Sequence, residues 1–347
     1  MVLRKKLVRP VARAVRKRCD AGIKMRNRLT IIVILAAALS FACDRINKLA
    51  GGFPTPPPKN TTPVVDLKKV ELKPDAELEK QIAAIASEAK GKVGVAAIVL
   101  ETGESATSNA DQRFPMQSVY KLPIAMAILH DVDDERLALD EQIGVTKDDF
   151  VGPNQHSPIR DKNPNGAKLT IREIIQYAVS ESDGTASDVL MRLAGGPGPI
   201  QRYLAAIGVG EMNVANTERE LGSNWQTQYE NYATPNAAIT LLRNLHEGSG
   251  ISPENRTILL KFMTDSSPGA NRLKGQLPVG TPVAHKTGTS GTQNGITAAT
   301  NDIGIITMTN GKHIAIAVFV SDSPAAEKTR EALIAKIAKA VWDRWAK

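Results

Sequence analysis

Cysteine is almost absent from this chain of 347 residues, which contains only Cys19 and Cys43. Because no cysteine follows residue 43, the remainder can form no intrachain disulfide, no zinc–cysteine site and no catalytic thiol. Aromatic residues make up only 4% of the sequence, which argues against a surface that recognises nucleic acid. These absences exclude thiol chemistry and weaken the case for a nucleic-acid partner.

Excess positive charge is absent once the first 48 residues are set aside. The whole chain has 44 Lys and Arg against 36 Asp and Glu, a formal charge of +8. Residues 1–48 hold 13 of the basic and 2 of the acidic residues, so residues 49–347 hold 31 and 34, a net charge of −3. The basic character therefore belongs to the leader, and the folded part is predicted to bind no nucleic acid.

No hydrophobic run suited to a full membrane span is evident. The apolar run at residues 29–42 has 14 residues, fewer than the roughly 20 that a spanning helix needs. It follows basic residues and ends at Cys43, which is typical of an export signal. We expect a signal peptide over residues 25–43, a periplasmic protein and a membrane tether through a lipidated Cys43. Ordinary signal cleavage and an uncleaved anchor are the alternatives.

Composition divides the rest of the chain into segments. Residues 1–24 form a basic extension, with Met25 an alternative start, and the glycines and prolines of residues 44–65 indicate an extended tether. The folded domain is expected over residues 66–347, which is long enough to bury a large core.

Apolar spacing predicts strands at both ends of this domain and helices between them. The predicted helices, besides one beginning near Ser118, are 75–90, 170–179, 186–193, 198–207, 235–245, 253–262 and 325–345, and the main predicted strands are 93–100, 282–289, 299–309 and 313–320. One sheet is therefore assembled from both ends of the domain. We expect an α/β lobe (66–115 and 270–347), a helical lobe (116–269) and a site in the cleft between them.

A Ser-x-x-Lys motif, Ser118 to Lys121, precedes an apolar run at 122–129. Positions i and i+3 share one face of a helix, so the Lys121 amine is expected beside the Ser118 hydroxyl. A serine nucleophile needs a base within hydrogen-bond reach, and desolvation or neighbouring cations can lower the pKa of a lysine enough for this task. The structural alternative is a helix N-cap followed by a solvated lysine.

Three further motifs follow in a fixed order. Ser182-Asp-Gly comes 64 residues after Ser118, Glu218-Arg-Glu-Leu lies in a poorly periodic loop over 213–225, and Lys286-Thr-Gly-Thr comes 168 residues after Ser118. Together with the Ser-x-x-Lys motif they resemble the signature of class A serine β-lactamases and penicillin-binding proteins. The chain resembles a class A serine β-lactamase from about residue 72 to its end.

Several shorter segments support the resemblance. They are Arg113-Phe-Pro-Met, His156-Ser-Pro-Ile-Arg-Asp, Gln228-Tyr-Glu-Asn, Lys286-Thr-Gly-Thr-Ser-Gly and Asn301-Asp-Ile-Gly. They are most similar to the extended-spectrum branch found in Bacteroidetes-type and related enzymes.

The resemblance implies a fold and an activity. The fold is the serine β-lactamase/transpeptidase type, of α/β (α+β) class, with an antiparallel sheet of about five strands flanked by helices, an all-helical lobe and the active site between them. The activity is hydrolysis of the β-lactam amide bond through a serine acyl-enzyme, which confers antibiotic resistance. It requires no cofactor and no metal. The implied partner is a small β-lactam, and the implied state is a monomer.

The resemblance also assigns roles to residues. Ser118 is the nucleophile, Ser182 relays a proton to the ring nitrogen, and Glu218 activates the hydrolytic water. The backbone N–H groups of Ser118 and Thr289 stabilise the oxyanion. Lys286 and the Thr287 hydroxyl bind the substrate carboxylate. The implied catalytic residues are Ser118, Lys121, Ser182, Glu218 and Lys286, and the implied substrate-binding residues are Thr287, Gly288, Thr289, Gly184, Arg272 and His156.

Some assignments have alternatives. Lys121 and Glu218 are both candidates for the base that deprotonates Ser118. Arg272 is either an extra cation for the substrate carboxylate or a surface arginine. His156 lies either at the cleft mouth or in an exposed loop. By strand alternation His285 is expected to face away from the site, and Glu220 is expected to brace its loop through an ion pair.

The sequence also departs from the family pattern. Gly184 and Gly222 stand where asparagine is usual, so two side-chain amides of the site are missing. The alternative functions are a penicillin-binding D,D-peptidase, which would not need Glu218, and a β-lactam sensor domain that stays acylated.

Overall fold

The computed structural model describes residues 70–346. The expected signal peptide, the tether and Cys43 lie outside the described residues, as do residues 66–69 of the expected domain. Among the described residues, no helix combines the length and apolar character that crossing a membrane requires.

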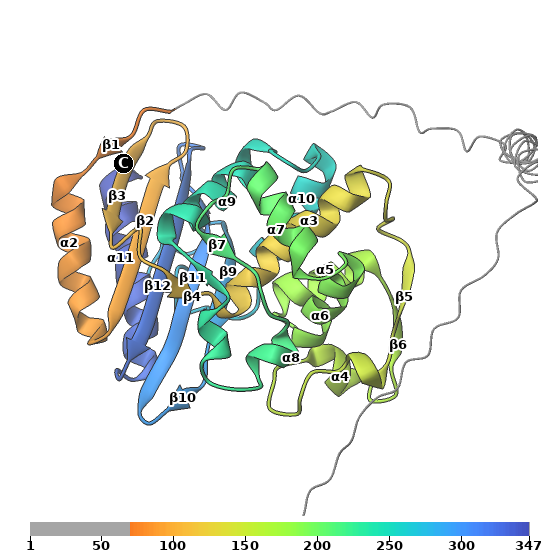
Figure 1. Cartoon of the computed structure of the whole chain (residues 1–347). Coiled ribbons are helices and arrows are strands. Elements are labelled where there is room, and N and C mark those ends of the chain that lie inside the picture. The colour runs from red at the N-terminus through yellow and green to blue at the C-terminus, as the bar shows by residue number, and fades with distance from the viewer. Residues whose placement is uncertain (1–69, 347) are drawn as a thin grey trace, which may run out of the picture. The chain divides into compact units, whose positions relative to one another are not determined.

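A seven-stranded sheet lies at the centre of the described part (Figure 1). Its strand order is β1-β3-β2-β12-β11-β10, and β9 also pairs with β11. The strands are β1 (Lys73–Pro74), β2 (Lys92–Val99), β3 (Glu104–Ser108), β9 (Val283–Thr289), β10 (Thr292–Gln293), β11 (Ile296–Thr307) and β12 (His313–Ser323). The five longer strands pair antiparallel with one another, as expected, and the parallel pair β1–β3 is only two residues long.

The sheet joins the two ends of the domain through the antiparallel pair of β2 and β12. Side chains alternate between its faces, because successive residues of a strand point to opposite sides. Val318 and Val320 belong to a core shared with α2 (Ala76–Ala86) and α11 (Glu327–Trp345), whereas Ala317 and Phe319 belong to the core of the helical part. Figure 1 shows α2 and α11 on one side of the sheet and α3 (Lys121–Asp133), α6 (Gly184–Leu193) and α9 (Pro235–Glu247) on the other.

The longer helices begin and end close to the predicted ranges, whereas two short ones, Pro158–Lys162 and Glu218–Leu221, have no predicted counterpart. The helices are α2 (Ala76–Ala86), α3 (Lys121–Asp133), α4 (Pro158–Lys162), α5 (Ile171–Ser180), α6 (Gly184–Leu193), α7 (Pro197–Ala206), α8 (Glu218–Leu221), α9 (Pro235–Glu247), α10 (Pro253–Thr264) and α11 (Glu327–Trp345). The hydroxyls of Thr234 and Ser252 cap α9 and α10 by accepting backbone N–H bonds, as expected. Caps of this kind fix where each helix starts.

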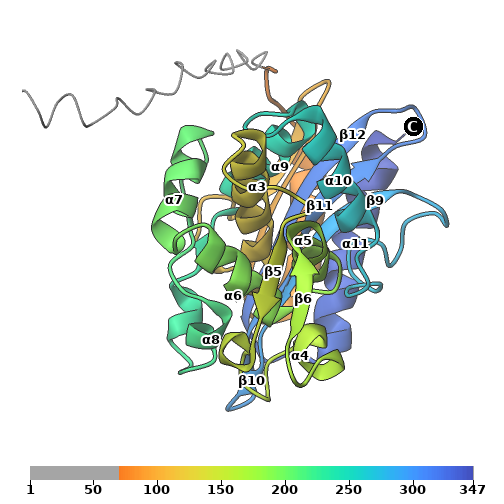
Figure 2. The ribbon, with the colours of Figure 1, turned by 90° about the vertical axis from the view of Figure 1, so that its right-hand side faces the viewer.

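The expectation of an all-helical lobe needs one correction. Between the two ends of the sheet, β5 (Gln142–Val145) pairs with β6 (Ala167–Thr170), and a three-stranded sheet joins β4 (Phe114–Pro115), β8 (Tyr232–Ala233) and β7 (Met212–Asn213). Figure 2 shows β5 and β6 side by side in this part. These strands have two to four residues, too few to give an alternating pattern in the sequence.

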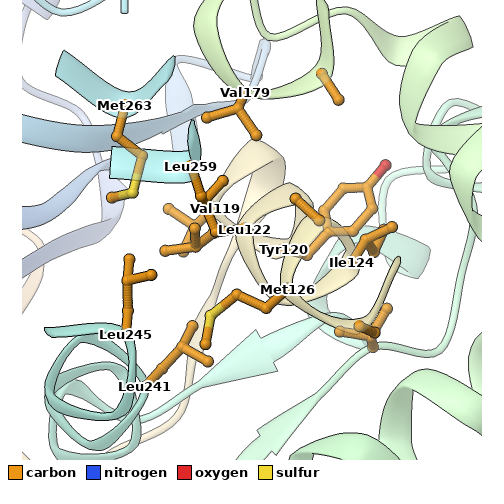
Figure 3. Packing of buried hydrophobic residues seen from close by; sticks show 14 of the residues in the cluster. Val119, Tyr120, Leu122, Ile124, Met126, Val179, Leu241, Leu245, Leu259 and Met263 are labelled. Carbon is orange, nitrogen blue, oxygen red and sulfur yellow. The ribbon is translucent and has the colours of Figure 1, made fainter. Parts of the chain in front are cut away.

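Helix α3 runs through the core of the helical part. Every residue from Lys121 to Leu129 is buried. Figure 3 shows Val119, Leu122 and Met126 packed among side chains of the surrounding helices, including Leu241 and Leu259. Because α3 is surrounded, the turn at its N-terminus is held in a fixed position, and this turn carries Ser118.

Candidate active site

Ser118 lies in a 3₁₀ turn, η2 (Gln117–Tyr120), that leads directly into α3. Its flanking residue Gln117 has φ of 47°, a conformation that is uncommon for residues other than glycine and often occurs at functional sites. The Gln117 side chain donates a 2.7 Å hydrogen bond to Gln228. The turn therefore holds Ser118 half-exposed, above a fully buried helix.

Lys121 is the central charged group of the site. Its side chain is 1% exposed, and its Nζ lies 3.1 Å from Oε2 of Glu218. The same Nζ donates a 2.8 Å hydrogen bond to the carbonyl oxygen of Ser182. Because a buried charge is costly unless it is paired, these contacts fix the ammonium group beside both the Ser-Asp-Gly turn and the Glu218 carboxylate.

Glu218 is the first residue of α8 within the loop that follows β7. Thr217 caps α8 and forms a capping box, in which the Glu220 carboxylate accepts the Thr217 N–H at 2.8 Å. Glu220 thus braces the loop, but the expected ion pair is not found among the described residues. The reason is local: its carboxylate turns back onto the helix N-terminus.

Two residues for which the sequence predicts no role, Asp188 and Tyr120, also position Glu218. Asp188, on α6, accepts the backbone N–H of Glu218 at 2.6 Å and that of Arg219 at 3.1 Å. Burial raises the pKa of Asp188 to about 6, even though these two N–H bonds act in the opposite direction. Tyr120 donates a 2.9 Å hydrogen bond to Oε2 of Glu218, and burial raises its pKa well above the usual value.

The side-chain amide of Asn231 joins the two ends of the same loop. Oδ1 of Asn231 accepts the backbone N–H groups of Ala215 and Asn216, each at 2.8 Å, and its Nδ2 donates to the carbonyl oxygen of Asn216 at 2.8 Å. Asn231 is fully buried. This amide holds both ends of the loop together. Asn231 ends the Gln228-Tyr-Glu-Asn segment, but no residue spacing in the sequence predicts this contact.

The Ser182-Asp-Gly motif forms the start of α6. Ser182 has φ of 60°, and Asp183 is the N-cap that accepts the N–H of Ala186 at 2.8 Å. Asp183 is buried, which raises the pKa of its carboxyl. The hydroxyl of Ser182 accepts a 2.9 Å hydrogen bond from Nζ of Lys286. Ser182 therefore connects Lys121, through its carbonyl group, with Lys286, through its hydroxyl group.

The Lys286-Thr-Gly-Thr motif occupies the end of β9. A Cβ atom at Gly288 would lie 2.2 Å from the carbonyl oxygen of Met116, so only glycine allows this strand to approach the Ser118 turn so closely. Thr287 and Thr289 line the same cleft as Ser118. Burial lowers the pKa of Lys286 well below its usual value, and the Lys121 ammonium adds to the effect.

Arg272 and His156 occupy different places around the cleft. Arg272 is buried behind β9 and donates to the Thr289 hydroxyl at 2.8 Å and to the carbonyl oxygen of Gly288 at 3.2 Å. It is not among the residues that line the cleft, whereas His156 is. His285 points away from the cleft and pairs with buried Asp302 at 2.9 Å, as strand alternation predicts.

The two glycines at usual asparagine positions lie in crowded surroundings. A Cβ atom at Gly184 would lie 2.7 Å from Cγ of Glu218, and one at Gly222 would lie 2.8 Å from the side-chain amide of Gln155. Gln155 donates to the carbonyl oxygen of Glu218 and accepts the N–H of Gly152 at 3.0 Å. In this chain, therefore, Glu218 and Gln155 occupy the space next to the two glycines.

The cleft has a volume of about 810 Å³, which is suited to a small molecule. Ser118, Ser182, Glu218, Thr287 and Thr289 all line it. Lys121 and Lys286 lie behind this surface, where they contact Glu218 and Ser182. The arrangement offers a hydroxyl nucleophile, buried amines and a carboxylate around one space, which are the groups that acyl transfer and hydrolysis require.

Known proteins resemble the chain over this whole region. Residues 77–345 match the model of the Beta-lactamase enzyme family. The β-lactamase VEB-1 of Pseudomonas aeruginosa is 42% identical over 254 residues, which cover 73% of this chain and 85% of the relative. A β-lactamase of Bacteroides uniformis is 35% identical over 77% of this chain and 91% of the relative.

A solved structure agrees with these relatives. The crystal structure of a β-lactamase from Chitinophaga pinensis has a TM-score of 0.76 and 43% identity, covering 77% of this chain and 99% of that one. The fold expected from the sequence is confirmed by this similarity. The chain belongs to the β-lactamase enzyme family as a class A serine β-lactamase, an enzyme that hydrolyses the amide bond of β-lactam antibiotics and confers resistance to them.

Proposed function

We propose that Ser118 attacks the β-lactam carbonyl carbon and that Glu218 activates the water that later releases the acyl group. Attack forms the Ser118 ester and breaks the ring C–N bond, and water then cleaves the ester and regenerates the hydroxyl. The observation that carries this proposal is the 3.1 Å contact between the Glu218 carboxylate and Nζ of Lys121. Lys121 stands three residues from Ser118, and the Ser118 and Glu218 side chains face one cleft.

The proton path follows from the same contacts. The Ser118 proton goes to Lys121 or Glu218, and the 3.1 Å contact allows it to pass between these two groups. Ser182 gives its hydroxyl proton to the departing ring nitrogen and regains a proton from its neighbours. The 2.9 Å hydrogen bond from Lys286 to the Ser182 hydroxyl supports this role, since it orients the hydroxyl and assists proton loss from it.

Substrate binding is assigned to β9. The backbone N–H groups of Ser118 and Thr289 would stabilise the oxyanion, a contribution of about 3 kcal/mol per donor. Lys286 and the Thr287 hydroxyl would bind the substrate carboxylate. Arg272, which holds the Thr289 hydroxyl from behind at 2.8 Å, would position this strand end, and His156 would contact substrate at the cleft mouth.

We propose a substrate range that includes both penicillins and cephalosporins. PER-1 of Pseudomonas aeruginosa, 38% identical over 76% of this chain, is named an extended-spectrum β-lactamase. The same words describe TLA-3, whose structure is 43% identical with a TM-score of 0.77. A steady-state panel of penicillins, cephalosporins and a carbapenem would measure this range directly.

The experiment for the nucleophile uses a chromogenic cephalosporin. The wild-type enzyme should hydrolyse it equally well with and without EDTA, since no step above uses a metal. Ser118→Ala should abolish both hydrolysis and acylation, as seen by intact mass. Stoichiometric acylation of the wild type without turnover would contradict the proposal and favour a sensor or a peptidase.

We also propose the organisation of the whole chain. Residues 66–347 form the catalytic domain, which works as an exported, periplasmic monomer. The uncharged run before Cys43 supports export, and the composition of residues 44–65 supports a tether between membrane and domain. The steps proposed above use groups of this chain alone, including Ser118, Ser182 and Glu218, so they need no second subunit. Size-exclusion chromatography with light scattering would test the monomeric state.

A further inference from the structure

Three side chains with metal-binding atoms meet far from the cleft: Glu101, His246 and His313. His313 opens β12 and pairs with Thr307 of β11, whereas Thr289 of the active site pairs with Thr300 near the other end of β11. The two sites therefore lie at opposite ends of the sheet. No step of β-lactam hydrolysis involves this cluster.

The donor atoms converge on one point. Nδ1 of His313 lies 2.7 Å from Oε1 of Glu101, and Nε2 of His246 lies 3.6 Å from the same oxygen. All three donor atoms lie within 4.8 Å of one another. The two imidazole rings have centroids 4.4 Å apart and are tilted by 49°. Nitrogen and oxygen ligands bind a metal ion at about 2.0–2.2 Å. The three donor atoms are close enough to reach one ion at this distance after small adjustments of the side chains.

The backbone holds each ligand in place. Oε2 of Glu101 accepts the backbone N–H of His313 at 2.9 Å, which leaves Oε1 directed at the two rings. His246 lies in the last turn of α9, and its carbonyl oxygen accepts a 2.8 Å hydrogen bond from Arg256. The ligands thus come from three elements that are fixed relative to one another, as a preformed metal site requires.

The local charges suit a cation at this position. A metal ion would bind the unprotonated ring nitrogens of His246 and His313 and the Glu101 carboxylate, whose donor atoms lie within 4.8 Å of one another. The Glu101 carboxylate, 3.6 Å from Nε2 of His246, supplies negative charge at the rings, whereas the Arg256 guanidinium bonds the backbone carbonyl of His246. The side chains of His246, His313 and Glu101 are 25%, 28% and 34% exposed, so an ion and a water ligand can reach them.

We propose that Glu101, His246 and His313 bind a divalent transition-metal ion such as Zn²⁺. Two imidazoles and one carboxylate suit Zn²⁺, Cu²⁺ or Ni²⁺ better than Mg²⁺ or Ca²⁺, which prefer oxygen ligands alone. Water would complete the coordination. The ion would join the end of α9 to the turn after β2 and to β12, and its role is structural, because the active site lies at the other end of the sheet.

The test is titration of the full-length chain with ZnCl₂, followed by calorimetry and by thermal unfolding. The wild-type protein should bind one more Zn²⁺ ion than His246→Gln or His313→Gln, or should bind this ion at least about tenfold more tightly. Zinc should also raise the Tm of the wild-type protein more than it raises the Tm of either variant. His130→Gln is the matched control, because His130 lies outside the cluster. Cys19 and Cys43 are present in every variant, so their contribution cancels in the comparison.

Co²⁺ spectra supply a second readout. Visible d–d bands should appear with wild type and His130→Gln and be lost with His246→Gln and Glu101→Gln. Hydrolysis of a chromogenic cephalosporin should be unchanged in all of these variants, which shows that they are folded. Equal zinc affinity, equal Tm shift and equal spectra in wild type and in the cluster variants would overturn the proposal.

Discussion

The environment of Glu218 depends on a single missing side chain. Gly184 stands where the sequence resemblance implies asparagine, and a Cβ atom there would lie 2.7 Å from Cγ of Glu218. Gly184 is the first residue of α6, where glycine is not subject to the full penalty of about 1 kcal/mol that it has in a helix interior. The missing side chain therefore leaves room for the carboxylate at little cost in helix stability.

Gly184→Ala is expected to destabilise the protein by about 1–3 kcal/mol through overpacking, and to slow deacylation because Glu218 is displaced. Chemical denaturation and the build-up of acyl-enzyme during turnover would measure the two effects. Gly210→Ala is the control, since a Cβ atom there meets nothing within 4 Å. Equal stability and turnover for Gly184→Ala and the wild type would show that Glu218 does not need this space.

Asp188 should make the stability of the enzyme depend on pH. Its pKa rises from 3.8 to about 6 on folding, so the native state binds more protons than the unfolded state between these two values. The free energy of unfolding should therefore fall as pH rises through this window, by about 3 kcal/mol at most. Above about pH 6 the contribution of Asp188 to the free energy of unfolding should be constant.

Asp188→Asn should remove this slope, and urea denaturation between pH 4 and pH 7 would measure it. The exposed residue Asp140 provides the control, Asp140→Asn, which should keep the wild-type slope. Asp188→Asn should also slow deacylation, since its amide cannot accept both the Glu218 and Arg219 N–H groups as a carboxylate does. A pH profile identical to that of the wild type would contradict the assignment.

At the scale of elements, periodicity predicted the long helices and strands well. The predicted helix 235–245 corresponds to α9, and the predicted strand 313–320 to β12. Short elements such as α8 were not predicted, because four residues carry no apolar period. The pattern Thr217-x-x-Glu220 could have revealed α8, since it is a capping box.

The loop that carries Glu218 is joined to the segment before α4 by Gln155. This side chain bonds to the backbone of Gly152 and of Glu218, and it fills the space beside Gly222. Nothing in the sequence indicates this, because the contact joins positions 63 residues apart. Long-range side-chain contacts of this kind could not be predicted from local patterns.

A double-mutant cycle would test the link. Gly222→Ala should destabilise the wild-type protein, because its Cβ would lie 2.8 Å from the Gln155 amide. The same change should cost less in a Gln155→Ala background, with a coupling of about 0.5 kcal/mol or more. Gly144→Ala, at a position with open space, should be additive with Gln155→Ala. Additivity for Gly222→Ala as well would exclude the proposed packing.

At the scale of the whole molecule, the motifs indicated the site because the fold brings distant segments together. Ser118, Ser182, Glu218 and Thr287 come from four parts of the chain and line one cleft. Their spacing predicted the family, but not the supporting groups. Asp188 lies outside every motif, and although Tyr120 and Asn231 lie within quoted segments, their contacts could not be read from the sequence.

The proposed tether and lipidation of Cys43 predict where the enzyme is found in the cell. If Cys43 is lipidated, the wild-type enzyme should sediment with membranes, and Cys43→Ala should release it to the soluble periplasmic fraction. Fractionation followed by activity assay would measure this. Cys19→Ala, which alters the only other cysteine, should leave the distribution unchanged. A soluble wild-type enzyme would instead indicate ordinary signal cleavage.

The central claim is that Ser118 is acylated and that Glu218 activates the water that releases the acyl group. The most direct test is intact-protein mass spectrometry of Glu218→Gln with a cephalosporin. The glutamine keeps the shape of the side chain but cannot act as a base for water. We predict that Glu218→Gln accumulates a covalent adduct on Ser118 that persists while wild-type enzyme has returned to its free mass. Wild-type turnover by Glu218→Gln, with no adduct detected, would contradict the mechanism.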